Sequence, residues 1–180
     1  MGADRSRASE RGNTILELAL ILTPMLALLL SIVEVSLPIF KKSTFTTAVR
    51  EGCRYGITYQ TTYNGTNYAS QTAAIKAVVQ ANAMGFLAGQ AGLDQIQVKY
   101  YDSNTFADVT NGGRGIANRD GNILEVTIAG YTHNWIAPVR WLWGSTAFQV
   151  SNSPLAITAS SADRLEALPP DPNGVSRPTP

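Results

Sequence analysis

An apolar segment near the N-terminus most constrains what this chain can fold into. Residues 15–33 read ILELALILTPMLALLLSIV, and a second apolar stretch, 35–40, follows Glu34. About 20 mostly apolar residues are enough to span a bilayer as a helix. A buried core helix is the alternative, but this segment lacks the amphipathic periodicity that such a helix usually has. The pattern therefore predicts a transmembrane helix over residues 13–40, preceded by a short leader over residues 1–12.

The segment differs from a cleaved secretory signal and gives only partial information on orientation. It is longer than the usual apolar region of a signal peptide, and no small-x-small cleavage site follows it. Positive charges occur on both sides, so the positive-inside rule does not decide the orientation. Size does favour one arrangement, because everything that could fold lies after Phe40. We expect a cytoplasmic N-terminus and a larger domain outside the membrane.

The overall charge and the cysteine content exclude some function classes. The 180 residues carry a formal net charge of +1, which gives no electrostatic reason to expect binding to nucleic acid. The single cysteine, Cys53, excludes an intrachain disulfide. Any domain outside the membrane must therefore be held together by packing alone.

Glu17 is unusual because it lies inside the most hydrophobic part of the chain. A carboxylate there costs several kcal/mol of desolvation unless a partner compensates it. One explanation is that Glu17 lies close enough to the membrane surface to reach water. The other is that its partner belongs to a second molecule. Gly12 precedes the apolar run, and Glu17 is the fifth residue after that glycine.

This junction resembles the class III signal of type IV pilins, in which a prepilin peptidase cuts after the glycine. The resemblance implies cleavage between Gly12 and Asn13, which would give Asn13 a free amine. In that family the glutamate of one subunit is thought to pair with the amine of its neighbour. A charge-assisted contact of this kind would offset the desolvation cost of Glu17.

A second motif makes the resemblance more specific. The apolar run is followed by AVREGCRYG, residues 48–56, and the chain later contains ITASSADRLE, residues 157–166. Together these stretches resemble the TadE-like family of minor pilins or pseudopilins of the tight-adherence (Flp, type IVb) pilus. The family motif falls on Arg50, Glu51, Gly52, Arg54 and Tyr55.

The remaining sequence predicts an α+β fold, in which a small antiparallel sheet and one or two packed helices follow the long helix. The first helix should continue over residues 41–57, with kinks at Pro24 and Pro38. An Asn-Gly turn is expected at Asn64 and an amphipathic helix at Ala69–Phe86. Alternating apolar residues predict the strands, and Gly-, Asn- and Pro-rich stretches predict a loop and a disordered tail. The strands are expected at 95–101, 123–131 and 155–161, the loop at 102–122, the α+β domain at 58–168 and the tail at 169–180.

Residues suited to catalysis or metal binding are sparse in this sequence. His133 is the only histidine, and we expect it at a surface or at the end of a strand. Cys53 fits a packed position beside a helix face. The stretch GGRGIAN, residues 112–118, weakly resembles a calcium-binding repeat, but Ala117 replaces the expected acid and no second repeat follows. We therefore expect no catalytic residues, no metal site, no cofactor and no enzymatic activity.

The stretch NWIAPVRWLWGSTAF, residues 134–148, is the least ordinary feature outside the first helix. A hydrophobic cap on the sheet would explain its aromatic residues. Trp and Arg are also enriched at subunit interfaces and Trp at membrane surfaces. The candidate interface residues are Trp135, Arg140, Trp141 and Trp143.

The resemblance implies a single-pass protein of the bacterial inner membrane that helps to assemble a pilus. Its implied partners are membrane lipid, prepilin peptidase, other pilin or pseudopilin subunits and Tad assembly proteins, with no nucleic acid. Two alternatives remain open at this point. One is a pseudopilin of a type II-like secretion system, and the other is a signal-anchored periplasmic binding domain. The second would need convergent polar groups that the sequence does not display.

Overall fold

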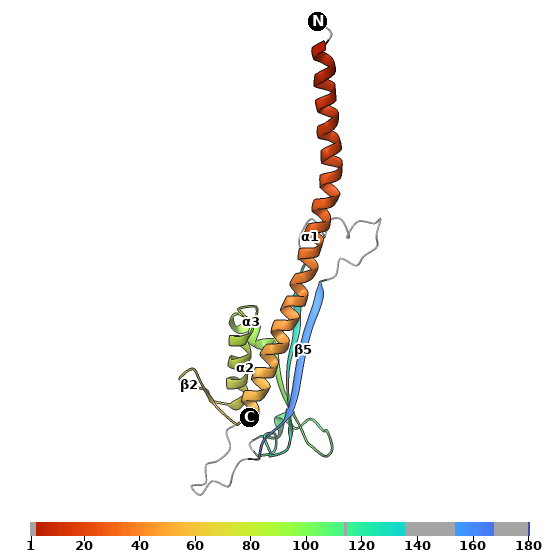
Figure 1. Cartoon of the computed structure of the whole chain (residues 1–180). Coiled ribbons are helices and arrows are strands. Elements are labelled where there is room, and N and C mark those ends of the chain that lie inside the picture. Colours follow the sequence, from red (N-terminus) through yellow and green to blue (C-terminus); the bar gives the residue numbers. More distant parts are fainter. Residues whose placement is uncertain (1–2, 114, 136–153, 168–179) are drawn as a thin grey trace. The chain divides into compact units, whose positions relative to one another are not determined.

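The computed structural model describes residues 3–113, 115–135, 154–167 and 180. It divides into two units, which are described separately. The helical unit comprises Met1–Pro38 and Asn134–Leu155, and the folded unit comprises Ile39–His133 and Ala156–Pro180. One long helix, short helices and small antiparallel sheets confirm the predicted α+β class (Figure 1). The predicted tail at 169–179, together with Arg140, Trp141 and Trp143, lies outside the described residues.

The first helix, α1, runs from Ala3 to Ile57 and belongs to both units. It continues without interruption through Pro24 and Pro38, and the ribbon in Figure 1 has no break. The helix also passes through Gly12 and Asn13, so the proposed cleavage point lies within helical backbone. Leu and Ala, which have high helix propensity, dominate the apolar part of α1.

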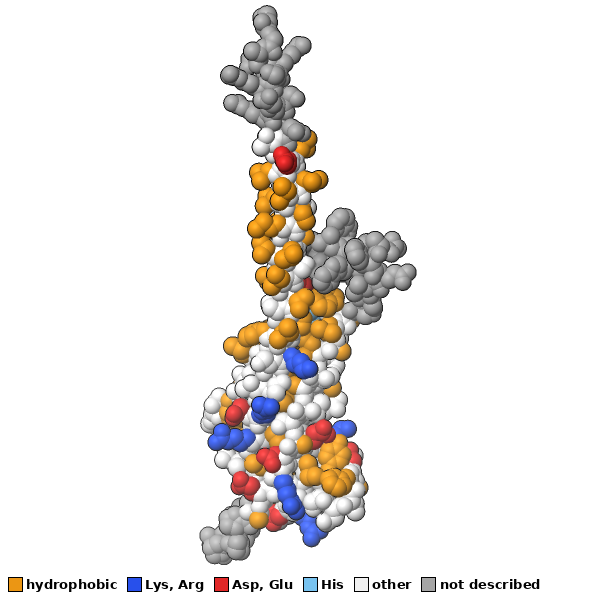
Figure 2. All heavy atoms as spheres, turned by 45° about the vertical axis from the view of Figure 1, so that its right-hand side comes forward, with side chains coloured by type: hydrophobic (Ala, Val, Ile, Leu, Met, Phe, Trp, Pro, Cys, Tyr) orange, Lys and Arg blue, Asp and Glu red, His pale blue; other side chains and the backbone are white. Residues whose placement is uncertain are grey.

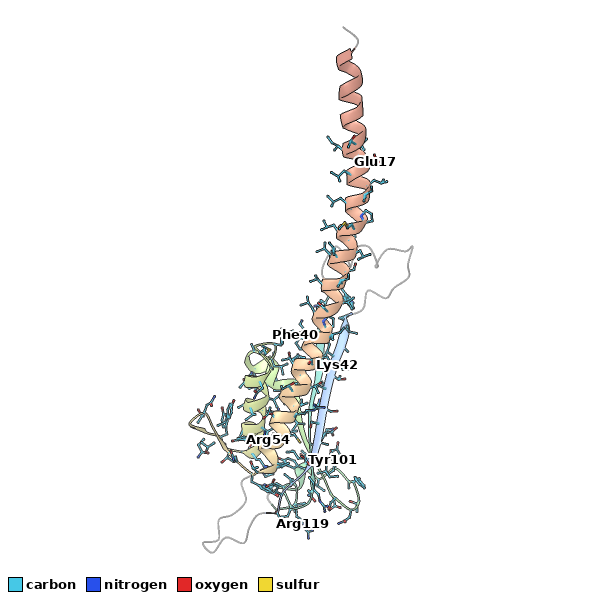
Figure 3. All side chains as sticks on the ribbon, in the orientation of Figure 1. Glu17, Phe40, Lys42, Arg54, Tyr101 and Arg119 are labelled. Atoms are coloured by element: carbon cyan, nitrogen blue, oxygen red, sulfur yellow. The ribbon has the colours of Figure 1, made fainter. Side chains whose placement is uncertain are left out.

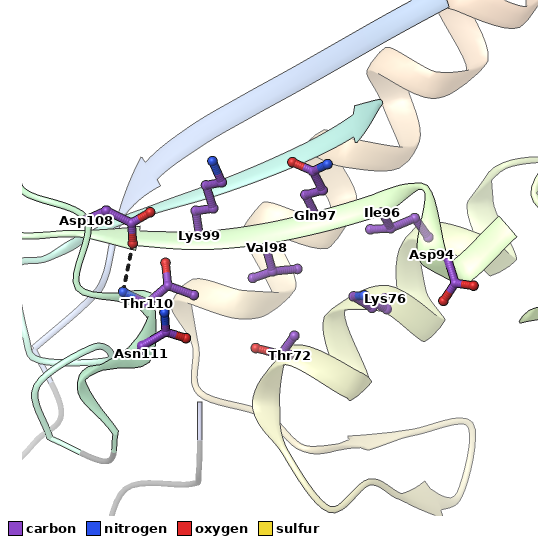
Figure 4. A pocket seen from close by; sticks show the side chains of 10 residues that line it. All are labelled: Thr72, Lys76, Asp94, Ile96, Gln97, Val98, Lys99, Asp108, Thr110 and Asn111. Carbon is purple, nitrogen blue, oxygen red and sulfur yellow. Dashed lines mark hydrogen bonds between the residues drawn. The ribbon is translucent and has the colours of Figure 1, made fainter. Parts of the chain in front are cut away.

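A three-stranded sheet forms the centre of the folded unit. Its strands are β3 (Ile96–Tyr101), β4 (Ile123–His133) and β5 (Leu155–Arg164), in the order β3-β4-β5. Strands β3 and β4 pair antiparallel with Val98 opposite Val126, and the β4 and β5 arrows in Figure 4 run in opposite directions. The three predicted strands are therefore present, with β4 and β5 longer than expected.

One face of this sheet forms the core with α1. Side chains in β3 and β4 alternate between buried and more exposed positions, as period-two patterning predicts. The buried set packs with residues of α1 into one apolar cluster. On the other face, Lys99 lies opposite Glu125, which accepts a hydrogen bond from Tyr101 at 2.9 Å. The α1 members of the core are Phe45, Ala48, Val49 and Cys53.

Helix α2 (Gln71–Asn82) is shorter than the predicted helix at Ala69–Phe86. It begins after Ser70, whose hydroxyl accepts a hydrogen bond from the backbone N–H of Ala73 at 3.1 Å and so caps the first turn. It ends before Met84 and Gly85, which both have positive φ and cannot continue a right-handed helix. The prediction that the helix reaches Phe86 is therefore wrong.

Three further short elements complete the folded unit. Helix α3 (Gly89–Asp94) was not predicted, since six residues carry too little periodicity to be recognised. Strands β1 (Thr62–Tyr63) and β2 (Thr66–Asn67) form a hairpin. Asn64 and Gly65 lie between them with φ of 48° and 76°, which fits a tight Asn-Gly turn. The predicted turn is thus confirmed.

Residues 102–122 form a loop, as predicted, that is anchored to the core. It contains one turn of 3-10 helix, η1 (Thr110–Gly112). Val109 donates a backbone hydrogen bond to Tyr100 at 2.9 Å. Ala117 and Asn118 are fully buried, so the position that lacks the acid of a calcium repeat serves as a packing residue.

Candidate functional site

The apolar part of α1 is exposed along most of its length. A 44-residue stretch, Thr14–Ile57, contains a window with mean hydropathy 2.4, and only 6% of that window is buried. Its large side chains include Leu16 at 70% exposure and Leu20 at 77%. A soluble protein would bury such a surface, because each exposed apolar side chain costs free energy in water. The helix is long and apolar enough to cross a membrane (Figure 2).

Polar side chains within this stretch are mostly satisfied by the helix itself. Thr23 and Ser31 donate hydroxyl hydrogen bonds to the carbonyl oxygens of Ala19 and Ala27, both at 2.7 Å. Bonds of this type let a hydroxyl enter an apolar environment at little cost. Glu17 and Glu34 are the two carboxylates within the apolar residues 15–40. Glu34 is buried, whereas Glu17 is exposed among apolar neighbours (Figure 3).

The second sequence motif separates into two faces of α1. Gly52, Cys53 and Gly56 are buried in the folded unit. The charged side chains of Arg50, Glu51 and Arg54 are exposed. The motif therefore combines residues that pack in the core of the folded unit with charged side chains on its surface.

The two motif glycines are required by close packing. A Cβ atom added at Gly52 would overlap Val79 Cγ2 of α2. At Gly56 it would overlap Leu124 Cδ2 and lie 2.7 Å from Ile75 Cδ1. Neither position has room for a methyl group. Glycine at these positions thus lets α1 approach both α2 and the sheet.

Cys53 is a packed thiol, as predicted. It is 2% exposed, and its thiol donates to the carbonyl oxygen of Leu124 at 3.6 Å. Burial, assisted by the negative charge of Asp163, raises the pKa of Cys53 to about 11. A neutral, buried thiol is a poor nucleophile and a poor metal ligand.

A buried hydrogen-bond network fixes the C-terminal end of α1. The Gln71 side-chain amide donates to the carbonyl oxygen of Gly56 at 2.6 Å. Its own oxygen accepts from the Asn118 amide at 3.3 Å, and Asn118 accepts from the backbone N–H of Gly115 at 3.0 Å. Carbonyl groups at the end of a helix lack partners within the helix, and this network supplies one. The sequence analysis did not identify Gln71, because nothing local marks it as a cap for a different helix.

Tyr55, the last residue of the family motif, supports the β1–β2 hairpin. Its hydroxyl donates to the carbonyl oxygen of Thr62 at 2.9 Å, and its ring meets that of Tyr63 edge-on with centroids 6.0 Å apart. An open hollow of about 440 Å³ lies beside these residues and is also lined by Glu51 and Arg54. Charged motif residues and an aromatic pair thus surround one surface depression.

A second hollow, of about 380 Å³, lies beside β3, α2 and η1 (Figure 4). Its charged side chains have both signs: Lys76, Lys99, Asp94 and Asp108. Hydrogen bonds from the side chain and backbone of Thr110 lower the pKa of Asp108. Neither His133 nor Cys53 lines this hollow. Among the described residues, no group of three His, Cys, Asp or Glu side chains is placed to hold a metal ion.

His133 is the last residue of β4 and is 4% exposed. Its strand-end placement is confirmed, but the alternative of a surface histidine is wrong. Lys41 Nζ lies 3.2 Å from its Nδ1 atom. The same ammonium lies over the rings of Phe86 and Tyr131, at 5.4 and 5.3 Å from their centroids. The lysine stem and the aromatic rings enclose this end of the strand.

The remaining predicted site residues are only partly placed. Trp135 is half-buried in the helical unit, but the other three members of the candidate interface lie outside the described residues. The side chains of Gly12 and Asn13 are also outside the described set, so cleavage between them stays a prediction.

The family model described as TadE-like protein matches residues 12–54. The match begins at Gly12 and ends at Arg54, so it contains the exposed apolar helix and most of the second motif. It confirms the resemblance of this part of the chain to TadE-like proteins. Within the part of the chain that the structure describes, one apolar helix is long enough to span a membrane, which indicates single-pass anchoring. No curated protein and no solved structure matches the chain.

Proposed function

We propose, on the basis of this match, that the chain is a TadE-like minor pilin or pseudopilin. It would act as a structural, non-enzymatic subunit in the assembly of a Flp (type IVb) pilus. The anchor would lie in the bacterial inner membrane with its N-terminus in the cytoplasm and the folded unit outside. Its partners would be prepilin peptidase, other pilin subunits and Tad assembly proteins.

One observation carries this proposal: the matched region contains an exposed apolar helix that includes an exposed carboxylate, Glu17. A helix that served only as a lipid anchor would gain nothing from an ionised group there, which costs ~2.5–3.5 kcal/mol at a helix centre on insertion scales. A helix that packs against other subunits can recover this cost through a specific ion pair.

The proposed pairing partner is created by cleavage. Cutting between Gly12 and Asn13 would give the mature chain an α-amine four residues before Glu17 in sequence. In an assembled bundle of helices, the amine of one subunit would pair with Glu17 of the next. The ion pair would then fix the axial offset between neighbouring subunits, because only one register brings the two charges together.

The test compares Glu17→Gln with Glu51→Gln. Both replace an exposed carboxylate of α1 by its neutral isostere, but Glu51 lies outside the apolar segment. Both variants should insert, reach normal levels and have the same mature mass, beginning at Asn13. Only Glu17→Gln should lose co-purification with pilus components, by roughly ten-fold or more, since an unpaired buried ammonium costs about 3–5 kcal/mol.

Three results would contradict the proposal. Full assembly of the Glu17→Gln protein would show that the carboxylate only reaches water. A mature protein that still begins at Met1 would exclude the processing step. Recovery of the native chain with components of a secretion machine in place of pilus components would favour the type II-like alternative.

A further inference from the structure

A turn in the folded unit exposes an apolar side chain beside the part of α1 that adjoins the membrane anchor in sequence. Residues 83–88 connect α2 to α3 and include Met84, which is 69% exposed. We propose that this α2–α3 turn docks the folded unit on the bilayer, with Met84 inserted among lipid headgroups. The proposal rests on the anchor alone and does not depend on any role in a pilus.

The turn is held firmly against α1 at the level where the apolar segment ends. The Phe86 ring meets Phe40 edge-on with centroids 6.1 Å apart, and Lys41 lies over the same ring at 5.4 Å. Thr44 Oγ1 lies 3.9 Å from Met84 Sδ. The turn therefore has a fixed position beside residues 40–44 of α1.

The backbone of the turn directs Met84 outward. Met84 has φ of 51°, a left-handed conformation that is uncommon for any residue except glycine. The residues on either side of the exposed tip, Ala83 and Leu87, are 0% and 1% exposed. The tip of the turn thus displays an apolar side chain between two buried residues. A solvent-facing turn would more commonly carry a polar residue at this position.

Lipid is the occupant that best fits this surface, because its α1 residues adjoin the membrane-spanning segment in sequence. Ile39 and Phe40 are the last residues of the predicted span and are 65% and 50% exposed. Lys42 is exposed directly after them, at the position where an ammonium group would meet lipid phosphates (Figure 3). Apolar side chains followed by lysine are typical of a helix crossing from acyl chains to headgroups.

The folded unit also contains a matched control for Met84. Phe106 is likewise 69% exposed and has φ of 55°. It lies in the loop after β3, where the end of β3 pairs with Leu124 of β4. Leu124 packs against Gly56, which is sixteen residues further along α1 than Phe40. At ~1.5 Å per residue, the two positions are separated by about 24 Å along the helix. A residue that far from Phe40 should remain in water.

The experiment places one fluorescent label on Met84→Cys or on Phe106→Cys in the full chain. The native thiol of Cys53 is buried, so the unsubstituted chain should take no label and serves as the background. The labelled chains are inserted into vesicles of phosphatidylethanolamine and phosphatidylglycerol. Quenching is then measured with iodide in water and with a nitroxide near the headgroup end of the lipid chain.

The label at position 84 should be quenched by the lipid nitroxide and should be at least about three-fold less sensitive to iodide than the label at 106. Equal iodide quenching at both positions would overturn the proposal. Shielding of position 84 from both quenchers would also overturn it, because protein would then cover the turn.

A second probe covers the case in which Met84→Cys does not fold. Loss of folding would be seen as labelling of Cys53. Ala88→Cys then replaces it, since Ala88 is exposed in the same connection and has φ of −72°, which cysteine adopts without strain. The same quenching pattern is expected there, and the same two results would refute docking on lipid.

Discussion

Replacing Gly56 by alanine should weaken the folded unit by a predictable amount. The new methyl group would overlap Leu124 Cδ2, and it would lie 2.7 Å from Ile75 Cδ1 and 3.2 Å from Ile75 Cγ1. Leu124 and Ile75 are both fully buried, so neither has free space into which it can move. The helix, the sheet or α2 must therefore shift.

Two opposing effects set the size of the loss. Inserting a methylene-sized group into a packed core costs about 1–3 kcal/mol. Alanine gains up to about 1 kcal/mol over glycine inside a helix. Gly56 is the penultimate residue of α1, so only part of that gain applies. The free energy of unfolding should fall by about 1–2 kcal/mol, or roughly 4–16 °C in the midpoint of thermal unfolding for a unit of this size.

The assay must report on the folded unit alone, because α1 dominates the far-ultraviolet signal. The reactivity of Cys53 does so, since the thiol is buried in the folded core and becomes accessible when that core opens. Labelling would be followed against urea for the full chain in detergent. Arg50→Ala is the matched control, as it changes an exposed residue of the same helix and should alter stability by no more than ~0.5 kcal/mol.

A Gly56→Ala chain as stable as the native one would refute the argument that close approach requires glycine here. The double variant Gly56→Ala with Leu124→Ala gives an independent check. Removing the overlapped side chain should make the two losses less than additive, because the new methyl group then occupies vacated space. Strict additivity would show that the overlap with Leu124 is not the cause.

Two further predictions concern the buried groups near the end of α1. Gln71→Leu should lower the free energy of unfolding by about 1–3 kcal/mol in urea, because the Gly56 carbonyl and the Asn118 amide lose a buried partner; an unchanged midpoint would contradict this role. Because burial raises the pKa of Cys53, the unfolded chain loses its thiol proton at a lower pH than the folded chain does. The part of the free energy of unfolding that depends on the neutral thiol is therefore complete below pH 9 and is lost as the pH rises to about 11. The free energy of unfolding of the Cys53→Ala chain should fall less than that of the native chain over this pH interval. An equal fall in both chains would contradict the raised pKa of Cys53.

The sequence predicted the elements whose patterns are long or chemically simple. The apolar run identifies α1 as a candidate membrane helix because a bilayer demands about 20 consecutive apolar residues, whatever the rest of the chain does. Alternation in β3 and β4 identified both strands, since one face of each meets the core. The Asn-Gly pair predicted the hairpin turn because both residues accept positive φ.

The same reasoning failed where remote residues decide the outcome. Periodicity extended α2 to Phe86, because Phe86 has the right spacing to lie on the buried face of a longer helix. In the structure it packs against Phe40 and Phe45 from a turn. His133 is buried at the end of β4, where Lys41 of α1 approaches it and also lies over the ring of Phe86. Contacts between residues so far apart in sequence leave no local signal.

The sequence by itself therefore determined the anchor, Glu17 within it and the family motif that follows. These features depend on the chemistry of consecutive residues. Only the tertiary structure divided that motif into buried glycines and exposed charges, since the division depends on where Ile75, Val79 and Leu124 approach α1. It also brought Phe86 beside Phe40 and Met84 beside Thr44, because a turn about forty residues later in the chain packs on this part of the helix. Local composition determines which segment can enter a membrane, and long-range packing determines which other residues accompany it.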